Sequence, residues 1–488
     1  MLDNFPFLSA ILASPALAVL IILFLPAGSK KAVRVVSLAS GAVCLALTLI
    51  LYLTYDQTAG GFQFVERHLW VKSLGLYYFV GVDGINLAML LLTSITFLTG
   101  VWTMWDLEMR VKEYFALMIF MVLGVYGFFM SLDLFWLFFF YDVALFPMYP
   151  LIAIWGSTRK EYGALKLTLY LLAGSALILP GILYVYFASP IQTFDLLALA
   201  QAGLPVNVQK IAFFLFLFGF GILAGLWPFH TWSPVGHVAA PTAVSMIHAG
   251  VLMKLGAYGV LRVGMFLCPE GLAYWAPLFA TLATIGIVYG AFVGLAQTDL
   301  KYVVGYSSVS HMGLVSLGLS TMTVGGINGA VFQMFSHGIM TALFFSAIGH
   351  IYDRTHTKMI PELGGMAKVM PQASFFFILA SLCGIGVPCL SSFWAELLVF
   401  INSFKVYPIL GVFAILGLVI SALFMLRVVQ RTFYGEKNEK YSGLPDMGWY
   451  MGAPRAILAG TLLFYGLFPR QILDLINTGV VPFVAGFK

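Results

Sequence analysis

Six ionisable residues lie deep within apolar stretches of the sequence: Asp142, His248, Lys254, His311, His337 and Glu396. A charge at the centre of a bilayer costs roughly 2.5–3.5 kcal/mol on insertion scales, and residues that bear this cost usually mark ion or proton pathways. Carboxylates, amines and imidazoles can exchange protons through short water chains, and imidazole titrates near neutral pH. These residue types therefore indicate proton transfer across a membrane.

Lys254 is the most informative of the six. It lies in AGVLMKLGAYGVLR, too deep in apolar sequence for its ammonium to reach either surface easily. Burial favours the neutral amine and a nearby acid favours the charged form, a balance that suits a proton carrier. His248 precedes it by six residues, so at 3.6 residues per turn the two side chains should point into different spaces.

Asp142 lies in LFWLFFFYDVALFPMYPLIAIWG, with apolar sequence on both sides. We interpret it as part of a proton pathway, and the alternative is a protonated, hydrogen-bonded structural acid. Pro147 and Pro150 should loosen the helix just beyond it. Asp83, in GVDGIN, is predicted to cap the start of a helix instead.

Glycines and prolines interrupt two apolar stretches: Gly225, Pro228 and Pro234 in the first, and Gly384, Gly386 and Pro388 in the second. Backbone opened at membrane depth is tolerated only against protein or a water-lined cavity. His230 and His237 lie at the exit of the first break, where either a relay or a structural role is open. Glu396 follows the second break.

His311 and His337 each lie in apolar sequence with serine or glutamine nearby. A single core histidine is usually just hydrogen-bonded, but two of them in line with Lys254 and Asp142 favour a relay. Metal ligation is the weaker alternative, because no pair has i, i+4 spacing with an acid or cysteine to complete the set. The four scattered cysteines form no CxxC pair, so neither a disulfide framework nor an iron–sulfur or zinc site is indicated.

The composition indicates which kind of fold positions these residues. The 488 residues are 61% hydrophobic and 9% charged, whereas about a quarter of residues are charged in soluble domains. The chain is therefore predicted to be an all-α polytopic membrane protein. Stretches long enough to cross about 30 Å of hydrocarbon predict fourteen helices, near 7–26, 33–54, 78–104, 113–131, 133–155, 163–188, 209–235, 240–263, 271–296, 299–320, 324–350, 371–402, 407–430 and 453–475.

The two broken helices are the seventh and twelfth, five apart, as in transporters built from inverted repeats. We therefore predict N-terminal helices in 1–106, a first five-helix repeat in 107–265, a second in 266–430, and a loop with a last helix in 431–488. Seventeen of the 25 lysines and arginines fall on one face and seven on the other. Because basic loops mark the cytoplasmic side, both termini and a loop at 55–77 are expected on the opposite side.

Several runs resemble the antiporter-like proton-pumping membrane subunits of NADH-quinone oxidoreductase (respiratory complex I), above all the M type. They are LFPMYPLIAIWG, WPFHTWSPVGHVAAPTA, AGVLMKLGAYGVLR, DLKYVVGYSSVSHMG, MFSHGIMTALFF and WAELL, in order over nearly the whole chain. The resemblance implies that Lys254 is a central lysine and Glu396 the distal acid of a half-channel leading outward. His311 and His337 would link the two.

The sequence also departs from this family. Asp142 stands where the family usually has a glutamate, and Leu223 stands where it has the lysine that pairs with that acid. Without a cation, desolvation favours the neutral acid, so the usual acid–lysine switch should not operate. SPVGH also lacks the acid usual before His237, whereas the sequence around His248 is closer to the L type. His248 as a substitute proton donor is our hypothesis.

The resemblance implies a subunit of an enzyme complex in a bacterial inner (cytoplasmic) membrane, coupling quinone reduction elsewhere to proton translocation. It implies no cofactor, metal or redox centre in this chain, and NADH, FMN, iron–sulfur clusters and quinone in partner subunits. L-type and N-type subunits would be neighbours within the lipid bilayer, and no nucleic acid is expected. The alternatives are a subunit of a related membrane-bound hydrogenase or of an Mrp-type cation/proton antiporter, or a paralogue with impaired pumping.

Overall fold

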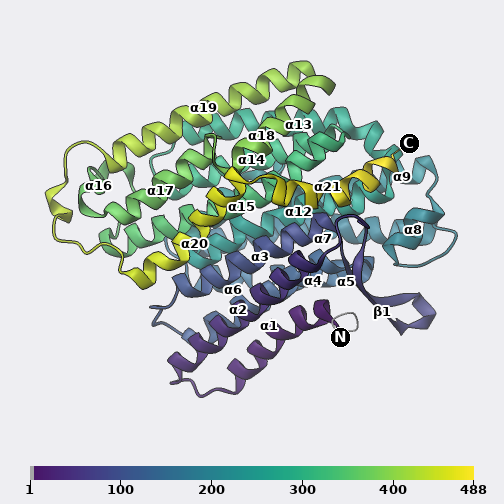
Figure 1. The fold of residues 1–488 in the computed structure, drawn as a ribbon, viewed down its shortest axis with the longest axis horizontal. Helices are drawn as coiled ribbons and strands as arrows, with labels where there is room; N and C mark the ends of the chain where they lie inside the picture. The colour runs from purple at the N-terminus through teal and green to yellow at the C-terminus, as the bar shows by residue number, and fades with distance from the viewer. Residues whose placement is uncertain (1–4, 488) are drawn as a thin grey trace.

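The computed structural model describes residues 5–487, and it is almost entirely helical. Long helices run side by side in one elongated bundle (Figure 1). The chain begins with four long helices, α1 (Phe7–Phe24), α2 (Lys30–Thr54), α3 (Gly84–Thr103) and α4 (Val111–Met130).

The segment 55–77, predicted as a loop between two helices, contains most of a β-hairpin, and the helix predicted from residue 78 begins only at Gly84. β1 (Gln63–Val71) pairs antiparallel with β2 (Leu76–Val82), and η1 (Lys72–Leu74) lies between them. The β-branched and aromatic residues of both strands favour this structure. Asp83 then caps α3 as predicted, because its carboxylate accepts from the amides of Ile85 and Asn86 at 3.0 Å.

Three helices are interrupted where glycine or proline predicts it. Their segments are α5 (Leu134–Leu145) and α6 (Met148–Trp155); α9 (Val206–Ala224), η2 (Phe229–Thr231) and α10 (Trp232–Ala239); and α17 (Pro371–Gly384) and α18 (Ser391–Val406). Gly225 and Gly386 have φ angles of 76° and 74°, a left-handed conformation that glycine adopts without a steric penalty. Pro147 separates α5 from α6.

The span that carries Lys254 is continuous but irregular. It consists of α11 (Thr242–Ile247), η3 (His248–Leu252), α12 (Met253–Gly259) and η4 (Val260–Met265). Both η3 and η4 are π-helical. Such segments are rare and occur frequently at functional sites, and nothing in the sequence pattern predicted them.

The remaining elements complete the bundle. They are α7 (Lys160–Ala188), α8 (Leu196–Ala202), α13 (Pro269–Ala296), α14 (Leu300–Ser320), α15 (Val324–Thr355), η5 (Ile360–Glu362), α16 (Met366–Val369), α19 (Pro408–Phe433), η6 (Glu439–Tyr441), α20 (Trp449–Leu467) and α21 (Arg470–Ala485). The last two replace the single helix predicted over 453–475, and they meet at a bend of 75°. In Figure 1 the β-hairpin, α8 and the C-terminal end of α21 lie toward one end of the bundle, and α16 lies at the other.

Within residues 5–487, eleven helices are long and apolar enough to cross a membrane, or twelve if α20 and α21 form one bent span. The chain is therefore a polytopic membrane protein, and the count of fourteen stays a prediction. Burial differs greatly among these spans. The 18-residue apolar stretches of Thr242–Met265 and of α15 are wholly buried, and that of α3 is 94% buried. The corresponding stretches of α2 and α19 are only 33% buried. Lys254 and His337 thus lie on the innermost helices.

Candidate functional site

Lys254 lies at the centre of the protein and is fully buried. Its ammonium donates to the carbonyl of Ala249, in the π-helical segment of its own span, and lies 2.7 Å from Nδ1 of His337 on α15. The wider π turn places a carbonyl within reach of the side chain five residues later. The lysine is therefore held between its own backbone and a histidine of another helix.

Two histidines connect Lys254 to Glu396. The ring centroids of His337 and His311 are 5.2 Å apart, and Nε2 of His311 lies 3.6 Å from Oε1 of Glu396. All four side chains are at most 4% exposed. The structure therefore brings together four residues singled out from the sequence, carried by α12, α15, α14 and α18.

The hydrogen bonds of these histidines constrain where protons can sit. A charged Lys254 can only donate to Nδ1 of His337, and the ring proton of a neutral His337 then lies on Nε2, which has no partner. In His311, Nδ1 lies 2.8 Å from the carbonyl of Ser307 and Nε2 lies 3.2 Å from that of Gly384. Both nitrogens of His311 therefore face acceptors, and the ring lies beside Glu396.

The second helix break shapes the pocket of Glu396. Gly386 has a left-handed φ of 74°, and a Cβ built there would lie 2.3 Å from Oε2 of Glu396. The carbonyl of Gly384, freed at the end of α17, faces His311. Oε1 of Glu396 is buried without a hydrogen-bond partner. The interruption therefore supplies both the space for the carboxylate and a polar group for the histidine.

His237, on α10, and His248, at the start of η3, form a second imidazole pair. Their ring centroids are 4.3 Å apart, and both rings are fully buried. His237 bonds Ser233 through Nε2 at 3.1 Å, while its Nδ1 and both nitrogens of His248 lack partners. Trp232 packs on His248 at 5.2 Å. As predicted, His248 and Lys254 point to different neighbours.

Asp142 lies apart from this array. Its carboxylate accepts from the hydroxyl of Ser175 at 2.8 Å and borders a cavity of 370 Å³ that is otherwise lined mostly by apolar residues of α5, α6 and α7. Leu223 is fully buried and uncharged, so this position supplies no cation to Asp142. Among the described residues, no cation pairs with Asp142.

His230 is also separate from the array. It is 2% exposed, its ring centroid lies 4.9 Å from that of Tyr289 on α13, and neither nitrogen has a hydrogen-bond partner. No contact links it to Lys254, His248 or His337. The relay and structural interpretations of His230 both stay open.

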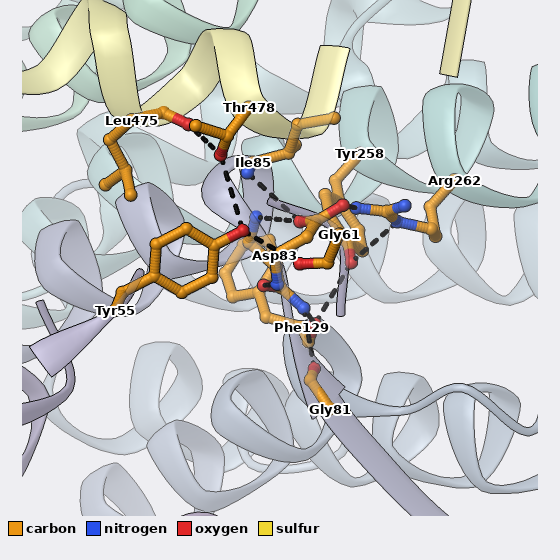
Figure 2. Close-up of polar contacts among 11 residues, drawn as sticks. Tyr55, Gly61, Gly81, Asp83, Ile85, Phe129, Tyr258, Arg262, Leu475 and Thr478 are labelled. Carbon is orange, nitrogen blue, oxygen red and sulfur yellow. Dashed lines mark hydrogen bonds and ion pairs between the residues drawn. The ribbon is translucent and has the colours of Figure 1, made fainter. Parts of the chain in front are cut away.

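The C-terminal end of the Lys254 span, near Arg262, is called its outer end after the orientation predicted above, and it holds a buried ion pair (Figure 2). Arg262 donates to Oδ2 of Asp83 at 2.5 Å and, through Nε, to the hydroxyl of Tyr258 at 3.2 Å. Tyr258 in turn donates to the carbonyl of Phe129 at 3.0 Å. Around the same point, Tyr55 donates to Gly61 and lies 3.3 Å from the hydroxyl of Thr478. This cluster ties the span to α3 and α4, and Tyr55 joins the neighbouring loop to α21.

The sequence reasoning missed this pairing, because Arg262 was counted among the loop cations. Arg262, Tyr258 and Lys254 follow one another at four-residue intervals, which places them on one helix face. That spacing was the available signal. It could not have identified Asp83 as the partner, because the two residues are 179 positions apart.

The array can bind and pass protons, and the part of the chain that the structure describes holds no group of three or more His, Cys, Asp or Glu side chains arranged for a metal ion. The four cysteines are free thiols. The groups in contact are an amine, two imidazoles and a carboxylate, which lie on four different helices. Their order gives a lateral path from the centre of the bundle toward the second helix break.

Comparisons with known proteins point to one family. Residues 131–421, more than half of the chain, match the transmembrane family described as NADH:quinone oxidoreductase/Mrp antiporter. The chain is 35% identical over 484 residues to the NADH-quinone oxidoreductase subunit M of Rickettsia conorii, an alignment covering 97% of this chain and 98% of that protein.

Solved structures give the same result. A chain of respiratory complex I from Thermus thermophilus superimposes with a TM-score of 0.90 at 27% identity, covering 99% of this chain and all of that chain. A chain of the Mrp complex from Dietzia sp. has a TM-score of 0.86 at 22% identity, covering 98% and 97% of the two chains. The second likeness shows the shared fold alone.

Proposed function

This chain belongs to the NADH:quinone oxidoreductase/Mrp antiporter transmembrane family, and on that premise we propose that it is a proton-translocating membrane-arm subunit of an NADH-quinone oxidoreductase. The 35% sequence identity to a subunit M, over 97% of this chain, supports this assignment. The observation that carries the translocating role is the contact series from Lys254 through His337 and His311 to Glu396.

In the proposed mechanism a proton is held at Lys254 and passes sideways to Glu396. The Lys254 ammonium gives a proton to Nδ1 of His337, whose Nε2 proton then moves on toward His311. His311 passes a proton to Glu396, which releases it toward the non-cytoplasmic side. No group is oxidised or reduced, and Lys254 returns to its starting state when it takes up another proton.

The energy comes from outside this chain. Electron transfer from NADH to quinone, through FMN and iron–sulfur clusters in partner subunits, would bias the protonation of the array. Such coupling needs an element with two states that both sites influence. The breaks between α9 and α10 and between α17 and α18 are our candidates, because neither break is locked by continuous helix hydrogen bonds.

The architecture we propose is that of two inverted five-helix repeats, 107–265 and 266–430, between N-terminal helices 1–106 and the C-terminal segment 431–488. The two broken helices occupy equivalent positions in these repeats, which supports the assignment. Both termini would lie on the non-cytoplasmic side of a bacterial inner membrane, because the lysines and arginines concentrate on the opposite face. L-type and N-type subunits would be its neighbours in the membrane arm.

The test is Lys254→Ala in the assembled complex, reconstituted into liposomes. Proton uptake or release per NADH oxidised is measured with a pH-sensitive dye, with Lys160→Ala as a control on a lysine of α7 outside the array. We expect Lys254→Ala to lower the number of protons moved per electron, and Lys160→Ala to leave it unchanged. An unchanged ratio in an intact Lys254→Ala complex would remove the proposal.

The alternatives are a subunit of a membrane-bound hydrogenase, of an Mrp-type cation/proton antiporter, or a paralogue with impaired pumping. The matching family description, which names the Mrp antiporter beside the quinone oxidoreductase, favours the antiporter among these. Purification from native membranes separates them: quinone-reducing partners support the main proposal, and antiporter partners with sodium-dependent proton exchange would replace it. Restoring a lysine with Leu223→Lys tests the impaired paralogue, because a clear gain in pumping would show that the natural sequence is limited at this position.

A further inference from the structure

Two buried lysines cover the C-terminal end of α10, at the face where the basic loops lie. Lys301 donates to the carbonyl of Ala240 at 2.8 Å, and Lys358 donates to that of Val238 at 3.3 Å. Both lysines are at most 6% exposed. Lys358 also lies 3.9 Å from Oδ2 of Asp299, which caps α14. Three ionisable groups therefore meet at one point of the basic face.

Burial makes proton exchange among these groups easier. It lowers the pKa of the Lys358 ammonium and raises the pKa of the Asp299 carboxyl. The energetic difference between the charged and neutral forms of the pair is thereby reduced. Hydrogen bonds between the backbones at Leu300 and Lys358 and at Ile360 and Thr298, 2.9 and 2.8 Å long, hold the two segments together.

The His237–His248 pair begins one turn further into the bundle. His237 lies on the last turn of α10, three residues before Ala240, whose carbonyl accepts from Lys301. His248 begins the π segment whose Ala249 carbonyl accepts from Lys254. Three of the four ring nitrogens lack a hydrogen-bond partner. Buried polar groups without partners are costly, so their presence here needs an explanation.

We propose that Lys301, with Lys358 and Asp299, is the proton entry site on the basic face, and that the His237–His248 pair passes protons from it to Lys254. This inference rests on the proposed function and names its uptake route. Each step is a proton transfer: the Lys301 ammonium protonates the imidazole pair, the pair protonates the neutral Lys254 amine, and Lys301 is reprotonated from the aqueous side through the Asp299 carboxyl.

This route answers the problem posed by Leu223. Asp142 has no cation beside it within the described chain, and it borders a mainly apolar cavity rather than the array. His248 and Lys254, in contrast, are joined through one short π segment. Uptake near the end of α10 therefore needs no lysine in α9.

The competing explanation is structural, because cations at the C-terminal end of a helix stabilise its free carbonyls. Lys301→Arg separates the two explanations, since arginine keeps the charge and the hydrogen bond but does not release its proton. Lys160→Arg is the matched control. Lys160 lies on the same face and donates to the Ile154 carbonyl at the end of α6 at 2.9 Å.

The experiment uses the assembled complex in liposomes and defines Lys254-dependent pumping as the difference between the wild type and Lys254→Ala. We expect Lys301→Arg and His248→Phe to reduce this quantity to the background of Lys254→Ala, and Lys160→Arg to retain it. Full Lys254-dependent pumping in an assembled Lys301→Arg complex would overturn the inference. Should Lys301→Arg fail to assemble, His248→Phe decides alone, and retained pumping there overturns it.

The two proposals fail in different ways. If Lys254→Ala pumps normally, the translocating role itself is lost. If Lys254→Ala is defective but Lys301→Arg is normal and Asp142→Asn is defective, protons enter beside Asp142 and only the uptake route is wrong.

Discussion

Removal of the Asp83 charge is expected to destabilise the protein severely. Asp83→Asn keeps a side-chain oxygen that can accept from the first amides of α3, but it leaves the Arg262 guanidinium without a counter-charge. Arg262 is 2% exposed and its partner oxygen is 2.5 Å away. Removing one member of a buried pair typically costs about 3–5 kcal/mol, which corresponds to a factor of at least about 100 in the folding equilibrium.

The cost should nearly vanish when both charges are removed together. Replacing a buried pair by groups of similar volume is often close to neutral, so Asp83→Asn combined with Arg262→Met should be much more stable than Asp83→Asn alone. The control is Glu108→Gln, which removes the ion pairs of the exposed Glu108 carboxylate with Lys30 and Arg34. Exposed pairs contribute little, so this variant should resemble the wild type.

Two measurements suffice for this prediction. One is the amount of the subunit found in the purified complex, and the other is the midpoint of its thermal unfolding in detergent. If Asp83→Asn were as stable as Glu108→Gln, the pair would not hold the outer end of the Lys254 span. If the effects of Asp83→Asn and Arg262→Met simply added in the double variant, the two side chains would not be energetically coupled.

Burial raises the pKa of Asp133 from 3.8 to about 6. The protonated carboxyl therefore stabilises the folded state below about pH 4, and this stabilisation is lost as the pH rises through about 6. Asp133→Asn should reduce this pH dependence of the free energy of unfolding by up to about 3 kcal/mol. Thermal unfolding between about pH 4 and 7 would contradict this prediction if the wild type and Asp133→Asn gave the same profile. Gly386→Ala should displace the Glu396 carboxylate and reduce pumping. Gly384→Ala should cost less, because its added methyl meets the flexible Met340 sulfur at 3.2 Å and lies at ordinary contact distance, 3.9 Å, from Cε1 of His311. Equal pumping by the two alanine variants would refute that role of the second break.

Local sequence signals predicted the interruptions and the cap well. Gly225 and Gly386 adopt the left-handed backbone that their residue type permits, and Pro147 divides α5 from α6. Asp83 caps α3 because a carboxylate one residue before a helix can bind its free amides. Each of these features depends on neighbours within a few residues, so a sequence reading can recover it.

Features that depend on distant contacts were not predictable in the same way. The π segments on either side of α12 leave no pattern in residue type, and the Arg262 partner lies on another helix. Lys301 illustrates the difficulty for site residues. By position it was a loop cation on the basic face, yet it is 5% exposed and bonded to α10, because the loops at 299 and 358 fold over the end of that helix.

The two ends of the Lys254 span differ in how completely their polar groups are satisfied, and this difference assigns a direction to proton movement. At the outer end, Arg262, Asp83 and Tyr258 bond one another and the backbone. At the basic end, His237 and His248 retain free nitrogens. A saturated ion pair resists the loss or gain of a proton, whereas an unpartnered imidazole can take one from a transient water chain. This difference supports the proposed route, in which protons enter the span at its basic end and leave it sideways through His337.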